Sequence, residues 1–156
     1  MRRVYVTPEG RSTPQNGFWT IQSSKSGEHR TFRIRTIPKD SKFAPGERVV
    51  GLLVGPDNTS NYKDFGFVTP EGINVWRRFQ KDGAAADGVV YCGGRLSAFE
   101  FYGRVLWGLL VENDESPWSK QGYSVEGSGT CVKCGRVLTE PESIALGIGP
   151  HCRSRM

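Results

Sequence analysis

Short apolar segments alternate with turn residues over the first half of the chain, and this pattern predicts a β-rich protein. The 156 residues include 20 glycines and 9 prolines, a content that favours many turns between short elements. An uninterrupted apolar run at 48–54 predicts a central strand that is buried on both faces. Strands are expected at residues 3–7, 17–23, 29–37 and 48–54.

The segment 29–37 alternates between apolar and basic positions. Phe32 and Ile34 fall on one face of the expected strand, while Arg33 and Arg35 fall on the other. Such a strand packs its apolar side into a core and presents its opposite side to solvent. We therefore expect a basic face on this strand.

Two phenylalanines separated by one glycine mark the segment 61–79. Phe65 and Phe67 are expected on one face of a strand, because side chains two positions apart share a face. Two aromatic rings on one side of a sheet can stack successive unpaired bases. The alternative is that both rings point inward as ordinary core residues. The alternative for residues 74–80 is the start of a helix, in which Arg77, Arg78 and Lys81 form a basic edge.

The segment 94–111 is rich in apolar residues that keep helical spacing, Phe99 and Leu106 among them. A helix is therefore one interpretation. Glycine is a poor helix former, so two strands joined by a turn at Tyr102 and Gly103 is the other.

Three of the four cysteines lie in the last quarter of the chain with a spacing typical of a metal site. Cys131 and Cys134 form a C-x-x-C pair, and Gly135 suits the tight turn that such a pair needs. Cys152 follows after a short segment. Zinc is the expected ion, because it binds sulfur and imidazole ligands without redox chemistry. The alternative is a set of buried thiols or a disulfide.

The fourth zinc ligand stays open. His151 is adjacent to Cys152, whereas Cys92 and His29 lie elsewhere in the chain. A carboxylate or a partner chain would also complete a tetrahedral site. A short helix is expected at 140–146, with so few apolar residues around it that a metal ion is needed to stabilise this part of the chain.

Composition divides the chain into three expected parts. Residues 113–129 are rich in serine, glycine and acidic side chains and are expected to be a linker. They would separate a β-rich body at 1–112 from a zinc-binding module at 130–156. The expected fold class is α+β and mostly β, with a small antiparallel sheet or barrel-like body and a C-terminal zinc knuckle.

The C-terminal pattern C-x-x-C-G-R-x-L-T-(D/E)-P-x-S-x-x-x-G-I-G-P-x-C resembles a short cysteine motif of uncharacterised bacteriophage and actinobacterial proteins. The resemblance covers residues 131–152 and implies a zinc-binding module in a phage-type protein, but implies little about its activity. The matching residues are Cys131, Cys134, Gly135, Arg136, Leu138, Thr139, Pro141, Ser143, Gly147, Gly149, Pro150 and Cys152.

A second, local resemblance covers residues 63–72. Their sequence K-D-F-G-F-V-T-P-E-G resembles the K-G-F-G-F-I-T-P-x-x-G strand of cold-shock domains, which implies binding of single-stranded nucleic acid. Asp64 stands where that strand has a glycine. The K-W-F-N segment expected upstream and the histidine expected near Arg78 are both missing.

The formal net charge is +5, an excess that favours an anionic partner. No apolar run reaches membrane-spanning length and the N-terminus has no secretory core, so no membrane partner is expected. With a metal-type cysteine cluster, this indicates a protein of the reducing cytoplasm of a bacterial host cell. The basic residues expected to contact nucleic acid are Arg33, Arg35, Arg77, Arg78, Lys133, Arg136, Arg153 and Arg155.

The sequence contains no recognisable catalytic constellation. The only histidines are His29 and His151, and the motifs of serine hydrolases, phosphate loops, zinc proteases and zinc deaminases are absent. An enzyme is therefore not expected. Two function classes remain, a phage-type accessory protein that binds single-stranded DNA or RNA, and an interaction module that binds and inhibits or redirects a host protein. The sequence does not indicate an oligomeric state.

Overall fold

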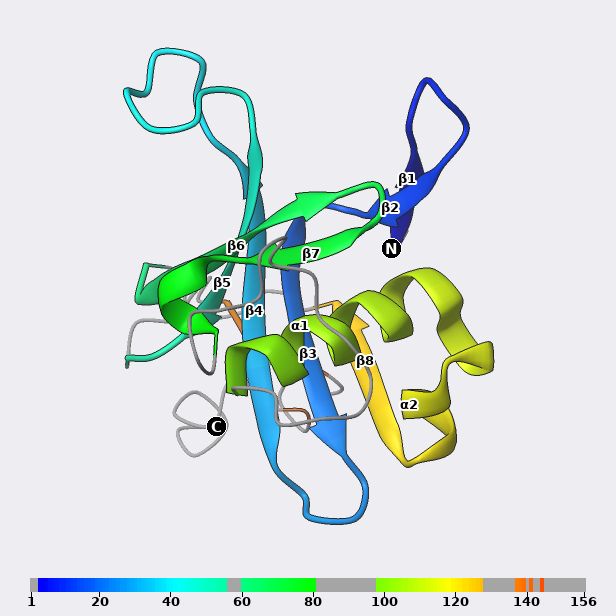
Figure 1. Cartoon of the computed structure of the whole chain (residues 1–156). Coiled ribbons are helices and arrows are strands. Elements are labelled where there is room, and N and C mark those ends of the chain that lie inside the picture. The colour runs from blue at the N-terminus through cyan, green and yellow to red at the C-terminus, as the bar shows by residue number, and fades with distance from the viewer. Residues whose placement is uncertain are drawn as a thin grey trace.

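The structure is a computed structural model that describes residues 3–55, 60–80, 98–127 and 137–139, together with Pro141 and Ile144. Its main element is an antiparallel half-barrel sheet of six strands in the order β7-β6-β5-β4-β3-β8 (Figure 1). The expectation of a mostly β, antiparallel body is therefore confirmed. The strands are β3 (Gly17–Ser23), β4 (His29–Thr36), β5 (Arg48–Leu53), β6 (Tyr62–Thr69), β7 (Gly72–Val75) and β8 (Tyr123–Gly127).

A separate hairpin precedes the sheet. Its strands are β1 (Val4–Val6) and β2 (Ser12–Pro14), joined by a turn in which Gly10 has a φ of 84°. Glycine adopts that left-handed conformation without a Cβ clash. Arg48 attaches the hairpin to the sheet, because its guanidinium donates to the Thr13 hydroxyl and the Pro14 carbonyl.

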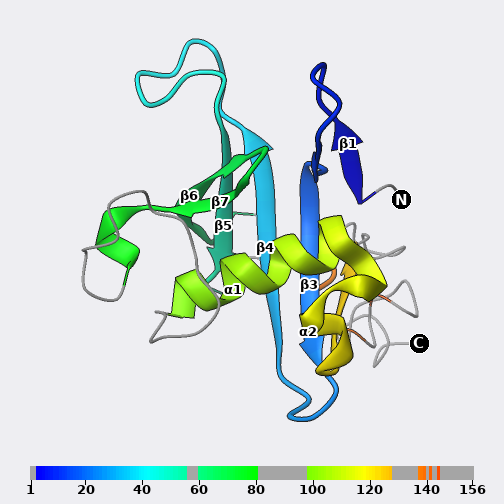
Figure 2. The ribbon, with the colours of Figure 1, turned by 45° about the vertical axis from the view of Figure 1, so that its right-hand side comes forward.

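The helical interpretation of 94–111 is confirmed over the residues that the structure describes. Helix α1 (Ala98–Trp107) continues into a π-helical turn, η2 (Gly108–Glu112), and crosses one face of the sheet over β4 and β3 (Figure 2). Gly108 is required there, because a Cβ at this position would lie 2.7 Å from the Ser116 hydroxyl oxygen. Across the described parts of the chain, we find no helix long and apolar enough to span a membrane.

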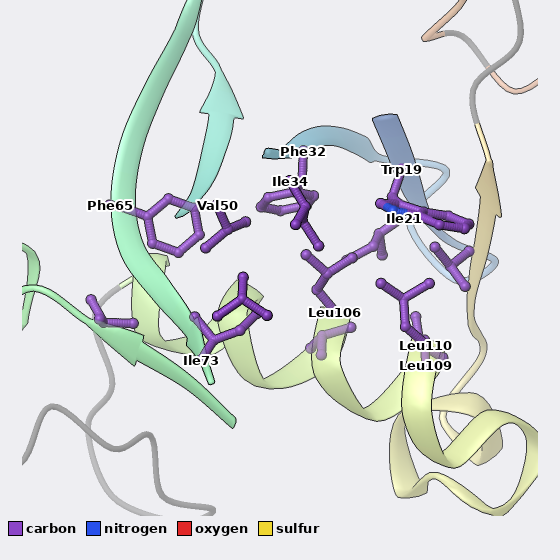
Figure 3. Close-up of a cluster of buried hydrophobic side chains, with 14 residues drawn as sticks. Trp19, Ile21, Phe32, Ile34, Val50, Phe65, Ile73, Leu106, Leu109 and Leu110 are labelled. Atoms are coloured by element: carbon purple, nitrogen blue, oxygen red, sulfur yellow. The ribbon is translucent and has the colours of Figure 1, made fainter. Parts of the chain in front are cut away.

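The core lies between α1 and the sheet face that α1 covers, which we call the inner face (Figure 3). Leu106 and Leu110 project from the helical segment toward Ile21 and Ile34 of the sheet. Burial of such side chains supplies most of the driving force for folding. The cluster consists of Trp19, Ile21, Phe32, Ile34, Val50, Phe65, Val68, Ile73, Val75, Val105, Leu106, Leu109, Leu110 and Val125.

The strands predicted from alternation are close to those observed. The bounds of β3 agree with the expected 17–23. In β5, Val49 and Val50 point to opposite faces and both are fully buried, so the expectation of a strand buried on both sides is confirmed there. Arg77 and Arg78 do not begin a long helix, because they lie in the single 3₁₀ turn η1 (Arg77–Phe79).

The expectation that 113–129 is a linker is wrong for its described part. These residues form η3 (Asn113–Glu115), α2 (Pro117–Lys120) and β8, and β8 pairs with β3. The serine and proline that suggested a linker instead start a helix, because the Ser116 hydroxyl accepts from the Trp118 N–H. Val125 then enters the core. The sheet therefore extends to Gly127.

Candidate functional site

A β-bulge in β6 decides which aromatic side chains reach the outer face, the sheet face opposite α1. Gly66 pairs with Val50 and Asp64 pairs with Gly51, so Phe65 has no partner on β5. The extra residue shifts the alternation. Gly66 also lets β7 approach closely at the bulge, because a Cβ there would lie 2.6 Å from the Asn74 carbonyl oxygen. Phe65 and Phe67 therefore lie on opposite faces, and the expectation that they share one face is wrong.

Phe65 belongs to the core. Its side chain is 0% exposed, and its ring centroid lies 6.2 Å from that of Phe32 and 5.1 Å from that of Phe99 on α1. The core alternative is thus the correct interpretation for this residue. A ring closed off in this way cannot stack on a base, so Phe65 is not part of a binding surface.

Phe67 lies on the outer face in a group of three aromatic side chains with Phe43 and Trp76, which we call the aromatic cluster. The Phe43 ring stacks on the Phe67 ring at 6.1 Å with 15° between the planes. The Trp76 indole meets both rings edge to face, at 5.5 Å from Phe43 and 5.4 Å from Phe67. Phe43 is 55% exposed, although such side chains are usually buried.

Positive charge lies beside the aromatic cluster. The Arg78 guanidinium lies 5.6 Å from the centroid of the Trp76 ring and 5.0 Å from that of Phe79. At these distances a cation is attracted to the aromatic face. The Trp76 Nε1–H is buried and has no hydrogen-bond partner within the described ranges, whereas a buried indole N–H usually finds one. The cluster thus combines exposed ring surface with a neighbouring cation.

A second group lies at the centre of the outer face, where Arg33 and Arg35 of β4 meet Asp64 of β6. Arg35 Nη2 donates to Asp64 Oδ2 at 2.9 Å, and Arg33 Nη2 lies 3.5 Å from Asp64 Oδ1. Gly51 leaves room for this group, because a Cβ there would lie 2.7 Å from Asp64 Oδ1. The basic face expected on β4 is therefore present, with one of its two charges offset by Asp64.

The structure describes some of the other predicted site residues and not the rest. Arg77 is exposed on η1, and His29 begins β4. His29 and Thr139 line the same surface hollow, whose volume is about 390 Å³. Within the described ranges, no three histidine, cysteine or acidic side chains come together to hold a metal ion. The predicted site residues outside those ranges are Cys92, Cys131, Lys133, Cys134, Arg136, His151, Cys152, Arg153 and Arg155.

The described part of the C-terminal segment is closely packed. Val137 is 7% exposed and Leu138 is 4% exposed. Thr139 borders the hollow that is also lined by residues of β4 and by Leu53 at the end of β5. This short stretch therefore lies against the sheet.

Sequence reasoning missed Phe43 and did not assign a role to Trp76. Phe43 lies between β4 and β5, and its signal in the sequence is an aromatic residue directly after Lys42. The contact of Phe43 with Trp76 joins the loop before β5 to the end of β7. The two residues are far apart in the sequence, so no local pattern predicts that they are in contact.

Comparison with known proteins gives a match only at the C-terminal end. Neither a curated protein nor a solved structure matches the chain. Residues 124–156 match a family model described as "Family of unknown function (DUF6011)", which covers β8 and the cysteine-containing segment and leaves the aromatic cluster outside.

Proposed function

We propose that this protein binds single-stranded nucleic acid through the aromatic cluster on the outer face. The observation that carries the proposal is the exposed Phe43 ring, which is stacked on Phe67 beside Trp76 and the Arg78 guanidinium. A planar base stacks on such a ring whatever its identity, and each stacked base contributes about 1–3 kcal/mol. This cluster replaces the platform of Phe65 and Phe67 that the sequence suggested.

Charge supports a polyanionic ligand at this surface. The chain carries a net charge of +5, and Lys42 and Arg77 are exposed next to Phe43 and Arg78 in the sequence. Basic side chains attract the phosphate backbone and release its counterions, so binding weakens as salt rises. A surface of aromatic rings bordered by cations is the usual construction of a site for unpaired strands.

A binding assay tests this proposal. A labelled oligonucleotide of about ten nucleotides is titrated at low salt and followed by fluorescence anisotropy. Phe43→Ala is expected to weaken binding roughly fivefold to a hundredfold, because one stacked base is lost. Val6→Ala is the control, since Val6 is 62% exposed on the hairpin, away from the cluster. Wild-type protein that binds neither DNA nor RNA at low salt rules the proposal out and favours a protein partner for the same surface.

We also propose one structural zinc ion held by Cys131, Cys134 and Cys152. Thiolates in a C-x-x-C pair with a third cysteine suit zinc, and Val137 and Leu138 between them are buried. A bound ion would fix the segment that carries them. The fourth ligand is to be decided among His151, Cys92 and His29.

Metal analysis tests the zinc proposal. Protein purified without added metal is expected to contain about one equivalent of zinc, and Cys131→Ser is expected to lose it. His151→Ala, Cys92→Ser and His29→Ala are compared side by side, and the variant that loses zinc identifies the fourth ligand. Wild-type protein with freely titrating cysteines and no zinc would contradict the proposal.

A further inference from the structure

The aromatic cluster and the arginine pair are neighbours on the outer face, because a residue of each lies opposite the same residue of β5. Arg35 of β4 pairs with Val49 of β5, and Val49 pairs with Phe67 of β6. Residues directly opposite one another project on the same face. Neighbouring strands lie about 4.8 Å apart, so the backbones at Arg35 and Phe67 are separated by about 10 Å. A ligand a few nucleotides long can therefore contact both groups.

The arginine pair carries more charge than its carboxylate offsets. Two guanidiniums share Asp64, which leaves a local charge of +1. Arg33 Nε, Arg35 Nε and Asp64 Oδ1 are buried and have no hydrogen-bond partner among the described residues. Buried unpartnered polar atoms are costly, and a cluster of them calls for a specific explanation. An anion beside the pair would offer acceptors to the two guanidiniums, but not to the carboxylate oxygen of Asp64.

The surroundings hold these side chains in place. The Arg33 guanidinium lies 4.9 Å from the centroid of the Tyr62 ring, and Tyr62 packs on Phe18 at 5.6 Å. The Arg35 side chain is 39% exposed, although its Nε is buried. Guanidinium groups match phosphate oxygens in two-pronged geometry, which makes arginine the usual phosphate ligand.

We propose that Arg33 and Arg35 form a phosphate subsite and that Asp64 is its internal competitor. This inference rests on the proposed function, since the phosphate belongs to the backbone of a strand whose base stacks on the aromatic cluster. Asp64 keeps the two guanidiniums together in the free protein. On binding, a phosphate oxygen takes over N–H donors from the carboxylate, and Asp64 lowers affinity because its charge repels the phosphate.

Removal of the competing charge is the first test. Asp64→Asn is expected to bind the oligonucleotide roughly fivefold more tightly, the factor expected for losing one repulsive unit charge at about 4 Å in a water-like dielectric. Glu71→Gln is the matched control, because Glu71 also pairs with an arginine, Arg11, at 2.7 Å, but on the exposed surface. It removes the same charge and is expected to change affinity little. A thermal melt of each variant shows that the fold is kept.

Removal of a guanidinium is the second test, and it does not depend on how Asp64→Asn folds. Arg35→Gln is expected to weaken binding and to lower the slope of log affinity against log salt by about 0.7, the value for one phosphate contact on a single strand. Arg11→Gln removes one positive charge elsewhere and is expected to lower the slope much less.

The outcomes separate this inference from the proposed function. Folded Asp64→Asn protein that binds no more tightly than Glu71→Gln overturns the role of Asp64 as competitor. Arg35→Gln that matches Arg11→Gln overturns the phosphate subsite. In both cases the aromatic site stands if Phe43→Ala still weakens binding. Wild-type protein with no affinity for oligonucleotides removes both proposals.

Discussion

The two faces of the six-stranded sheet are built from the same strands but carry different side chains. The inner face is closed by α1, and its side chains form one apolar cluster. The outer face carries an exposed phenylalanine, a cation beside aromatic rings, and two arginines that share one aspartate. Buried polar atoms that have no partner among the described residues lie on or next to this outer face. The inner face therefore stabilises the fold, and the outer face is the surface for which we propose ligand binding.

Phe65 and Phe67 show the difference between the two faces within a single strand, β6. They are two positions apart, yet the bulge directs Phe65 to α1 and Phe67 to the aromatic cluster. If the faces have different roles, truncation of these two residues affects different properties. Stability is the property expected to change at Phe65, and affinity is the one expected to change at Phe67.

The largest expected effect follows truncation of the inner residue. Phe65→Ala removes a fully buried ring that contacts Phe32 and Phe99, and is expected to lower the free energy of unfolding by about 3–5 kcal/mol. Denaturant unfolding measures this loss. A decrease below about 1 kcal/mol would show that the inner face is not the core.

A methyl group at the bulge is expected to affect both faces. Gly66→Ala places a Cβ 2.6 Å from the Asn74 carbonyl oxygen, and the overlap is expected to cost about 1–3 kcal/mol. The strain also displaces Phe67, so oligonucleotide affinity is expected to fall with stability. Gly103→Ala is the control, because its nearest neighbour would be the Ile73 Cγ2 at 3.3 Å, a side chain that can shift. Equal stability of wild type and Gly66→Ala would argue against the close approach of β7 to Gly66.

The smallest expected effect concerns the cation beside the rings. Arg78→Gln is expected to weaken oligonucleotide binding and to lower the salt slope by about 0.7, with a stability change of about 0.5–1 kcal/mol from the lost cation–π contacts. Anisotropy titrations at several salt concentrations measure the slope. An unchanged slope would remove Arg78 from the binding surface while leaving the aromatic cluster in place.

Local patterns in the sequence predicted most of the strands and the helix. The alternation at Phe32 and Ile34 placed β4 with its correct face inward, and helical spacing placed α1. The segment that forms α2 and β8 was misinterpreted as a linker. Its serine, proline and glycine residues are common in linkers, but here they cap a helix and end a turn, with Gly122 at a φ of 96°.

The candidate site was much less predictable, because it depends on contacts between distant segments. The bulge at Phe65 exists only in the pairing of β5 with β6, and without it the period of two places Phe65 and Phe67 on the same face. The stacking of Phe43 on Phe67 joins a loop to a strand further along the chain. Asp64, a departure from the cold-shock pattern, acquires its role only when β5 brings it opposite Arg33.

The most direct test of the difference between the two faces is one affinity measurement on a matched pair, Phe65→Leu and Phe67→Leu. Leucine nearly conserves volume, so both proteins are expected to fold, and a thermal melt checks this. The oligonucleotide dissociation constant is calculated from the concentration of folded protein. Phe67→Leu is expected to bind at least about fivefold more weakly than wild type, because a stacking ring is lost. Phe65→Leu is expected to bind like wild type with a lower melting temperature. Equal weakening by both variants, or none by Phe67→Leu, would contradict the assignment of binding to the outer face.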